Sequence, residues 1–335
     1  MSAETVDLLV VGAGPTGIAV GAAARAVGLT TLLVDRGPLV AALVDYPNEM
    51  QFFTTRDRLE IAGVPFAIPE EKPNRRQAIA YYQAVAAAHQ LPLALREEVV
   101  SVEPLDGRFR ILGRRSWAPT ERRARAVAFA TGYFSWPRRL GVPGEDLATV
   151  RNRYREPWSH FGERVVIVGG GNSAAEAALD LWRHGARVTI VHRRSELKPT
   201  IKYWVRPDVE NRIAEGSITA LFDTCVTAFE PGAVILDRDG ASTRLEADAV
   251  YVLVGYRPDV DLYRAAGVRV DAETLVPEHD PESCETNVPG LYVAGTIQAG
   301  RDTHRIFIEN SRDHGPRIAG HLVRRLRSAG DSGPG

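Results

Sequence analysis

A glycine motif near the N-terminus has the spacing of a phosphate-binding turn. Residues 12–17 read GAGPTG, a complete GxGxxG that directly follows the apolar run of residues 6–11. In such a turn the first glycine permits a tight bend, the second lets the backbone approach a pyrophosphate, and the third lets helix and strand pack closely. The helix that follows offers free N–H groups and a positive dipole end to phosphate. The motif therefore predicts a dinucleotide site.

An acidic residue completes this first motif. Residues 18–27 predict a helix of small side chains that Gly28 closes, and residues 32–34 predict a second buried strand ending at Asp35. A carboxylate at that position accepts hydrogen bonds from ribose hydroxyls and repels a 2′-phosphate. Strand, turn, helix, strand and acid fall in the order of a βαβ unit, so we expect a dinucleotide site rather than a glycine-rich turn without function.

A second glycine motif in the middle of the chain ends with the opposite charge. Residues 169–174 read GGGNSA, a GxGxxA variant, after a strand predicted over residues 164–168. The strand predicted over residues 188–191 leads into His192, Arg193 and Arg194 instead of an acid. Guanidinium groups form bidentate, charge-assisted bonds to phosphate, so this end favours the 2′-phosphate of NADP(H). The alternative is a solvated basic turn.

Two glycine turns of opposite charge predict two different dinucleotides in one chain, FAD at the first and NADPH at the second. The fold class we expect is α/β, with two Rossmann-like dinucleotide-binding domains of three layers (ββα) and the NADPH domain inserted in the FAD domain. Residues 1–138 and 266–335 would form the discontinuous FAD-binding domain, and residues 139–265 the NADPH-binding domain. The residues expected to bind NADPH are Gly169, Gly171, Asn172, Ser173, Ala174, His192, Arg193 and Arg194.

Shorter patterns predict further elements. Residues 74–89 have the spacing of an amphipathic helix, and residues 99–102 and 109–112 read as a hairpin around Asp106 and Gly107. A last helix is expected from about Thr303.

The overall composition excludes several classes of protein. The net charge is −1 over 335 residues, with no basic or acidic tail, so nothing indicates binding to nucleic acid or an anionic membrane. No apolar run reaches the roughly 18 residues of a membrane span, and no signal peptide is expected. The two cysteines, Cys225 and Cys284, form neither a CxxC nor a metal-ligand pattern. We expect a cytoplasmic protein without a metal site, in which Cys225 is buried.

Four segments resemble successive motifs of the thioredoxin-reductase-like flavoproteins. They are residues 130–132 (ATG), 142–145 (VPGE), 255–259 (GYRPD) and 286–295 (TNVPGLYVAG). The resemblance implies a homodimer or higher homo-oligomer in which hydride passes from NADPH to the flavin and on to a disulfide. Together with the first glycine turn, it implies FAD contacts from Gly12, Gly14, Pro15, Thr16, Gly17, Asp35, Arg36, Val99, Thr131, Gly132, Gly295 and Thr296.

One feature of thioredoxin reductases is missing. Their CxxC would fall between Glu145 and Gly162, and that stretch contains no cysteine. A thiolate is required to attack a disulfide, so the usual dithiol relay to thioredoxin is excluded.

Residues 46–55 (YPNEMQFFTT), 59–66 (LEIAGVPF) and 306–310 (IFIEN) are similar to the bacillithiol-disulfide reductase family, which also lacks the CxxC. This resemblance implies reduction of a low-molecular-weight thiol disulfide such as bacillithiol disulfide. That family often carries a cysteine where Thr16 stands here.

Other functions stay open at this point. A ferredoxin– or flavodoxin–NADP reductase of thioredoxin-reductase type also needs no cysteine, and its partner would be a small electron-carrier protein. A flavin monooxygenase shares the second glycine turn and its basic end. A flavin redox sensor without turnover is the alternative from outside the enzymes. In every case the flavin carries the chemistry, so the sequence identifies no catalytic side chain.

Overall fold

The computed structural model describes residues 5–330, which form two compact units. Unit 1 comprises residues 5–44, 50–136 and 257–330, and unit 2 comprises residues 45–49 and 137–256. The sequence had placed residues 257–265 in the second domain. In the structure they belong to unit 1, because Val260, the N-cap of helix α7 (Asp261–Ala265), and Tyr263 in the middle of that helix are buried in the core of unit 1.

Unit 1 is built on a seven-stranded sheet in the order β3-β2-β1-β6-β5-β4, with β15 also paired to β6. The first half of β6 runs antiparallel to β5, whereas its second half runs parallel to β15. The carboxyl ends of β1, β2, β6 and β15 therefore meet at one edge. The strands are β1 (Thr5–Val11), β2 (Thr31–Asp35), β3 (Leu93–Leu95), β4 (Glu97–Leu105), β5 (Arg108–Arg115), β6 (Ala118–Phe129) and β15 (Leu291–Val293).

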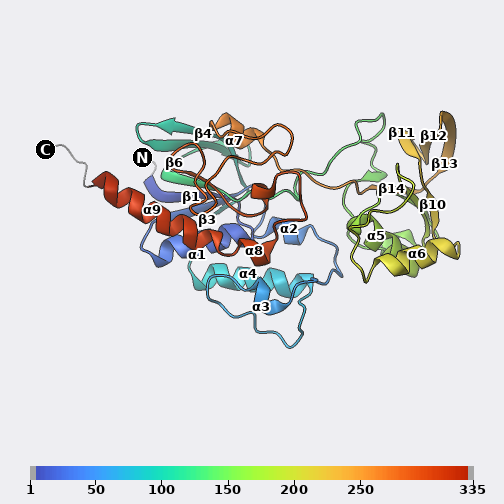
Figure 1. Ribbon diagram of the computed structural model, residues 1–335, viewed down its shortest axis with the longest axis horizontal. Helices are drawn as coiled ribbons and strands as arrows, with labels where there is room; N and C mark the ends of the chain where they lie inside the picture. Colours follow the sequence, from blue (N-terminus) through green and yellow to red (C-terminus); the bar gives the residue numbers. More distant parts are fainter. Residues whose placement is uncertain (1–4, 331–335) are drawn as a thin grey trace. The chain divides into compact units, whose positions relative to one another are not determined.

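Helices cover this sheet, and the first and last of them pack side by side (Figure 1). They are α1 (Pro15–Ala26), α2 (Ala41–Val44), α3 (Arg56–Leu59), α4 (Arg75–Ala88), α7, the 3₁₀ turn η2 (Gly295–Ala299), α8 (Ile308–Ser311) and α9 (His314–Gly330).

Local sequence accounts for most of these boundaries. Helix α4 begins after Asn74, whose side chain forms a capping box with Gln77, so the helix predicted there is confirmed. The β4–β5 hairpin is confirmed too, with Asp106 and Gly107 at φ angles of 47° and 73°.

The helix expected from about Thr303 begins later in the structure, as the short helix α8 followed by α9. The Asn310 side chain accepts a hydrogen bond from Phe307 N and donates one to Arg305 O, so the first turn of α8 starts only at Ile308.

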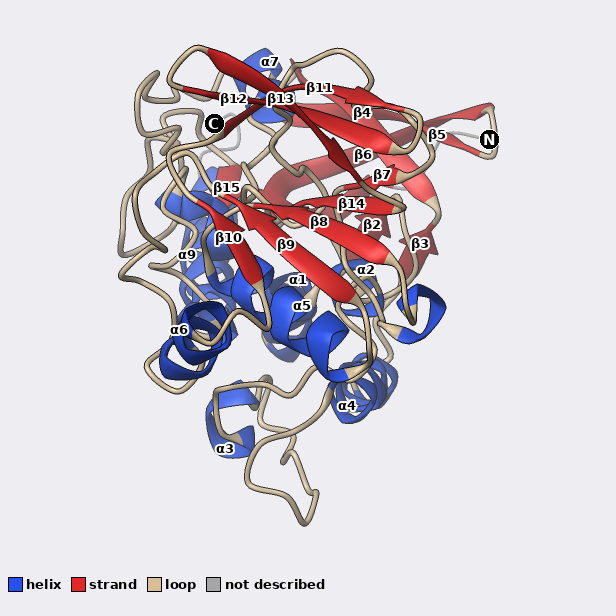
Figure 2. Cartoon of the chain, turned by 90° about the vertical axis from the view of Figure 1, so that its right-hand side faces the viewer, coloured by secondary structure: helices blue, strands red, loops and turns tan. Residues whose placement is uncertain are grey.

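Unit 2 is a three-layer ββα arrangement (Figure 2). Its parallel sheet has the order β10-β9-β8-β14-β7, and β11-β12-β13 form a second, antiparallel sheet. Alternate residues of the central strands pack against helices α5 and α6 on one face and against the second sheet on the other. Strands buried on both faces explain the continuous apolar runs of the sequence.

The elements of unit 2 are β7 (Val150–Arg151), η1 (Trp158–His160), β8 (Arg164–Val168), α5 (Asn172–Arg183), β9 (Arg187–Val191), α6 (Arg206–Ala214), β10 (Thr219–Leu221), β11 (Cys225–Glu230), β12 (Ala233–Arg238), β13 (Ala241–Glu246) and β14 (Ala249–Val252). The α/β class with two Rossmann-like folds is confirmed. Within residues 5–330, no helix has the length and apolar character required to cross a membrane.

A buried carboxylate joins the edge of the sheet of unit 1 to its longest strand. Glu97 is 1% exposed, and its two oxygens accept hydrogen bonds from Arg122 Nε and Nη2 at 3.1 and 2.9 Å. Burial is the largest single influence on Glu97 and opposes its ionisation, but the hydrogen bonds and charge of Arg122, together with Thr120 and the charge of Arg115, outweigh burial and hold the pKa of this carboxyl below its usual value. Next to it, Glu98 forms a more exposed pair with Arg114.

We expect Glu97→Gln to lower the thermal unfolding midpoint clearly more than Glu98→Gln, because an exposed pair contributes only about 0–1 kcal/mol. The excess should vanish as the pH falls. A carboxyl whose folded pKa is depressed stabilises the protein above its unfolded pKa of about 4.3 and stops doing so below its folded pKa. Unfolding midpoints of both variants and the unaltered chain between pH 7 and 3 test this, and equal effects at pH 7 would contradict it.

Candidate functional site: two glycine turns

The first glycine turn, residues 12–17, connects β1 to α1. Gly12 has a φ of 111°, and a Cβ atom there would collide with Ala130 O. A Cβ atom on Gly17 would collide with Gly12 O, whereas one on Gly14 would find no heavy atom within 4 Å. Packing within unit 1 thus requires the first and third glycines. The second faces open space at the N-terminus of α1, where a ligand can approach the backbone.

Asp35 is held beside this turn at the end of β2. Its Oδ2 accepts a hydrogen bond from Ala13 N, and its Oδ1 accepts one from Gly37 N, both at 2.7 Å. A carboxylate has about four acceptor positions, so further ones stay available for ribose hydroxyls. The neighbouring guanidinium of Arg36 lies 4.9 Å from the ring centroid of Trp136.

The segments after β6 and β15 complete this end of the sheet. Ala130 N donates to Val11 O, and the next residue, Thr131, has a buried hydroxyl without a hydrogen-bond partner among the described residues. A Cβ atom on Gly132 would lie 3.9 Å from the hydroxyl of Thr296, so these two segments meet. A buried unpaired hydroxyl is costly, and a polar group of a bound ligand would satisfy it. The turn, the acid and this hydroxyl fit a dinucleotide.

Val99 lies farther along, in β4, at a register shift between Val99 and Ser101. The start of β4 is tied to the segment after β2 because Arg96 N donates to Gly37 O. Val99 is only partly buried against the core, so its side chain is not fully used in packing.

Two residues near the C-terminus were not predicted from the sequence: one lies beside the first glycine turn and the other beside Gly295. Ser311 Oγ lies 3.1 Å from Thr16 Oγ1, across 295 positions of sequence. His314 Nδ1 accepts a hydrogen bond from Gly295 N at 3.0 Å. Burial, followed by repulsion from Arg317 and His279, lowers the pKa of His314 to about 4, so the ring is neutral at pH 7. No local pattern marked either residue, because only the fold brings α8 and α9 to α1.

The second glycine turn, residues 169–174, repeats this geometry in unit 2. Gly169 N donates to Val191 O, a Cβ atom there would collide with Leu253 O, and Ala174 is buried in the third position. Gly171 is the N-cap of α5, and Ser173 lies exposed in its first turn. Asn172 has a different role from the one expected. Its side chain donates to Thr200 O and accepts from Lys202 N, which docks residues 198–202 at the start of the helix.

His192 does not act as a third cation. The ring is 7% exposed and lies against Gly170, where a Cβ atom would come within 2.6 Å of it. Burial and then the charges of Lys198, Arg193 and Arg194 lower the pKa of His192, so the imidazole is neutral at pH 7. Its buried Nε2 has no hydrogen-bond partner in the part of the chain that the structure describes.

The third positive charge beside Arg193 and Arg194 is Lys198, not His192 as expected. Lys198 N donates to Gly170 O at 2.9 Å, which fixes the residue beside the turn. Partial desolvation and repulsion from Arg138, Arg193 and Arg194 lower the pKa of Lys198. Across residues 5–330, neither Lys198, Arg193 nor Arg194 forms an ion pair with a carboxylate. An anionic group would relieve this repulsion, so the site fits a phosphate. The one signal in the sequence was that Lys198 is one of three lysines in the chain.

Neither cysteine forms a redox pair. Cys225 is exposed at the start of β11, so the prediction that it is buried was wrong; an edge strand leaves its first residue open to solvent. Cys284 is 1% exposed, and burial raises the pKa of its thiol. Both are free, and a buried thiol of raised pKa is a poor nucleophile at neutral pH.

Comparison with known proteins identifies the family. Residues 9–295 match the profile of the pyridine nucleotide-disulphide oxidoreductases. The chain belongs to this family. Among its relatives, the bacilliredoxin reductase Bdr of Bacillus subtilis (strain 168) is 34% identical over 322 residues, which are 95% of this chain and 97% of that protein.

Two solved structures of oxidoreductases from this family are closely similar. The bacillithiol disulfide reductase Bdr of Bacillus cereus has a TM-score of 0.93 at 33% identity and covers 96% of this chain and 100% of its own. The enzyme of the same name from Staphylococcus aureus has a TM-score of 0.91 at 33% identity and covers 96% of this chain and 99% of its own.

The basic end of the second turn should select between pyridine nucleotides. We expect Arg193→Ala combined with Arg194→Ala to raise KM for NADPH about tenfold or more, with little change for NADH, because only NADPH offers a phosphate to the guanidinium groups. Arg238→Ala, an exposed site on β12 of the same unit, is the matched control. Equal effects on both nucleotides would contradict the assignment.

The lowered pKa of His314 has a consequence for stability. Its folded pKa of about 4 lies below the unfolded value of about 6.5, so the unfolded chain binds the proton first and stability falls as the pH drops through this window, by up to about 3 kcal/mol. His314→Asn offers an acceptor to Gly295 N without titrating. We expect thermal unfolding of this variant to depend less on pH between 7 and 4; identical profiles would contradict the role of His314.

Proposed function

We propose that the chain is an NADPH-dependent FAD oxidoreductase that reduces a low-molecular-weight thiol disulfide such as bacillithiol disulfide. The observation that carries this proposal is the opposite charge at two equivalent places. Asp35 ends β2 beside the first turn, and Arg193 and Arg194 follow β9 beside the second. Family membership and the full-length similarity to Bdr proteins support the same function.

FAD would be held by unit 1 and NADPH by unit 2. Apart from the boundary residues, these units correspond to the expected FAD-binding domain (residues 1–138 and 266–335) and NADPH-binding domain (residues 139–265). The N–H groups at the start of α1, with Pro15 in the first turn, would bind the pyrophosphate, and Asp35 would accept from ribose hydroxyls. The Thr131 hydroxyl, which has no hydrogen-bond partner within residues 5–330, would bind the ligand. When bound, FAD supplies the chemistry that accepts a hydride and donates two electrons.

The second half of the reaction has no thiol at the expected place. Thr16 stands beside Ser311, and two hydroxyl groups cannot form a mixed disulfide. We propose that the disulfide accepts its electrons without a covalent intermediate on the protein. Two electrons and two protons convert one disulfide into two thiols, with NADPH as the source of hydride.

Two further features belong to this proposal. A homodimer is supported by the resemblance to thioredoxin-reductase-like flavoproteins, and analytical ultracentrifugation tests it. A cytoplasmic location is supported by the presence of only two cysteines, both free, which is typical of reducing compartments.

The test is anaerobic mixing of the yellow holoprotein with NADPH. Rapid loss of flavin absorbance is expected, and its absence would contradict a reductase and favour a redox sensor. Steady-state oxidation of NADPH with bacillithiol disulfide, ferredoxin or oxygen as acceptor then separates the disulfide reductase from a ferredoxin reductase and a monooxygenase.

The absence of a protein thiol from the mechanism gives a separate prediction. The double variant Cys225→Ser with Cys284→Ala should reduce the disulfide at a rate within about twofold of the unaltered enzyme, because neither thiol lies in a redox pair. Flavin reduction by NADPH in the same variant is the control for folding. Loss of disulfide turnover with intact flavin reduction would show that a cysteine takes part.

A further inference from the structure

A polar cavity of about 450 Å³ lies in unit 2, along β7 and the segment that follows it. Its walls include Arg151, Asn152, Arg153, Arg155, Ser159 and Tyr251. All of these except Tyr251 belong to the stretch between Glu145 and Gly162, where thioredoxin reductases carry their CxxC. The nucleotide turn of the same unit contributes no residue to these walls. The cavity is therefore a second, chemically distinct place in unit 2.

The three arginines of the cavity differ in how their charges are balanced. Arg153 Nη1 and Arg155 Nη2 share the carboxylate of Asp45, at 2.8 and 2.5 Å. Arg151 is exposed and forms no ion pair with any carboxylate of residues 5–330. Arg151 is therefore the one guanidinium of the cavity without a carboxylate partner among the described residues.

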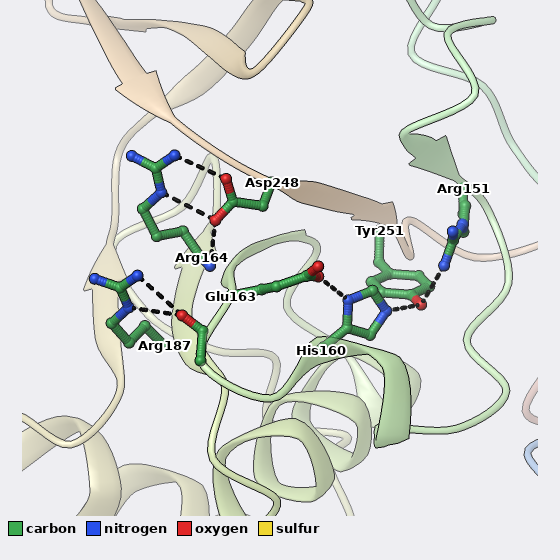
Figure 3. Close-up of polar contacts among 8 residues, drawn as sticks. Arg151, His160, Glu163, Arg164, Arg187, Asp248 and Tyr251 are labelled. Atoms are coloured by element: carbon green, nitrogen blue, oxygen red, sulfur yellow. Dashed lines mark hydrogen bonds and ion pairs between the residues drawn. The ribbon is translucent and has the colours of Figure 1, made fainter.

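Arg151 is nevertheless held in place by buried groups (Figure 3). His160 Nδ1 lies 2.6 Å from Glu163 Oε2, and His160 Nε2 lies 2.8 Å from the hydroxyl of Tyr251. That hydroxyl in turn accepts a hydrogen bond from Arg151 Nη1 at 3.2 Å. His160 and Tyr251 are each 2% exposed. The relay Glu163–His160–Tyr251 thus leads from one surface through the interior of unit 2 to the cavity.

The donors and acceptors of this relay fix its direction. A carboxylate only accepts, so His160 Nδ1 donates to Glu163, and a guanidinium only donates, so the tyrosine oxygen accepts from Arg151. The lone pairs of the tyrosine oxygen then face Arg151, whose remaining N–H groups stay available. The Tyr251 ring lies 6.0 Å from Arg151 Cζ and packs edge-on against Tyr154, with centroids 5.4 Å apart. Such an arginine loses little freedom when a ligand binds.

We propose that this cavity binds the carboxylate group of a small organic molecule, with Arg151 as its ligand. The planar fork of a guanidinium matches a carboxylate, and Asn152 and Ser159 offer neutral partners for the rest of the molecule. Glu156 also lines the cavity, and its negative charge repels a phosphate group, which carries two charges in one place, more than a carboxylate group, which carries one. A dicarboxylate such as succinate can bind through one carboxylate and keep the other in solvent. His160 and Tyr251 are positioning residues that act through Arg151. This site does not depend on the function proposed above.

Titration calorimetry with succinate tests the site on the holoenzyme. We expect Arg151→Gln to weaken succinate binding about tenfold or more, because a charge-assisted bidentate contact is lost. Arg187→Gln is the matched control, since Arg187 lies on β9 of the same sheet and donates to the carbonyl of Gly162 instead (Figure 3). Equal affinity in Arg151→Gln and the unaltered enzyme, no binding of succinate, or tighter binding of inorganic phosphate would each overturn the proposal.

A double-mutant cycle tests the relay separately from any structural role of Tyr251. Tyr251→Phe keeps the ring and removes the acceptor for Arg151, so succinate affinity should fall several-fold while Arg151→Gln/Tyr251→Phe binds no more weakly than Arg151→Gln alone. Additive losses would overturn the positioning role.

The same carboxylate chemistry can come from the disulfide substrate or from a separate effector. Competition of succinate with bacillithiol disulfide in steady state, together with a raised KM in Arg151→Gln, assigns the site to the substrate. An unchanged KM alongside the calorimetric loss assigns it to an effector. Reduction of the flavin by NADPH should be the same in Arg151→Gln, so failure of this site and failure of the proposed function give different results.

Discussion

Both dinucleotide sites depend on one steric constraint, the close approach of backbone to backbone where a parallel strand turns into a helix. In unit 1 the carbonyl of Ala130 leaves no room for a side chain at Gly12, and the carbonyl of Gly12 leaves none at Gly17. Leu253 O excludes a side chain at Gly169 in the same way. The turns are held this tightly because each lies at the carboxyl edge of parallel strands, with the N-terminus of a helix aimed outward. The side chains that distinguish the two sites are positioned by this shared backbone geometry.

The two sites differ in the charged residues at the end of the second strand. In unit 1 the Asp35 carboxylate is fixed by two backbone N–H groups, so it is an oriented acceptor rather than a mobile surface charge. In unit 2 three cations crowd the corresponding place, and the pKa of Lys198 is lowered, by partial desolvation first and then by repulsion from Arg138, Arg193 and Arg194. One end accepts hydrogen bonds from hydroxyl groups and the other attracts a phosphate. A common backbone geometry therefore gives opposite selectivities.

Residues 145–162, the region in which thioredoxin reductases carry their dithiol, have a different composition in this chain. They are rich in arginine, and a relay of buried polar groups supports one guanidinium from behind. In unit 1, Thr16 and Ser311 place a pair of hydroxyl groups beside the first glycine turn. Neither region contains a cysteine, which agrees with the proposed mechanism, in which the cofactors carry the chemistry and the protein orients them.

Local sequence determined the parts that depend on neighbours along the chain. The GxGxxG spacing, the acid at Asp35, the capping box at Asn74 and the hairpin at Asp106 and Gly107 are short-range patterns, each with one low-energy conformation. The order of the two turns and the absence of a dithiol also follow from the sequence alone, and the similarity to known flavoproteins indicated where that dithiol would lie.

Only the tertiary structure decided the identity of groups that meet across long distances. His314 reaches Gly295 and Ser311 reaches Thr16 because α8 and α9 fold back onto α1, and no periodicity in either segment encodes that contact. The degree of burial is a property of the whole fold. It lowers the pKa of the buried His192, and it differs from the expectation at Cys225, which lies exposed. The same holds for the relay from Glu163 to Arg151, whose members come from β7, β14 and the segment before β8. Sequence fixes local geometry through backbone sterics, whereas charge state and partner depend on what packs nearby.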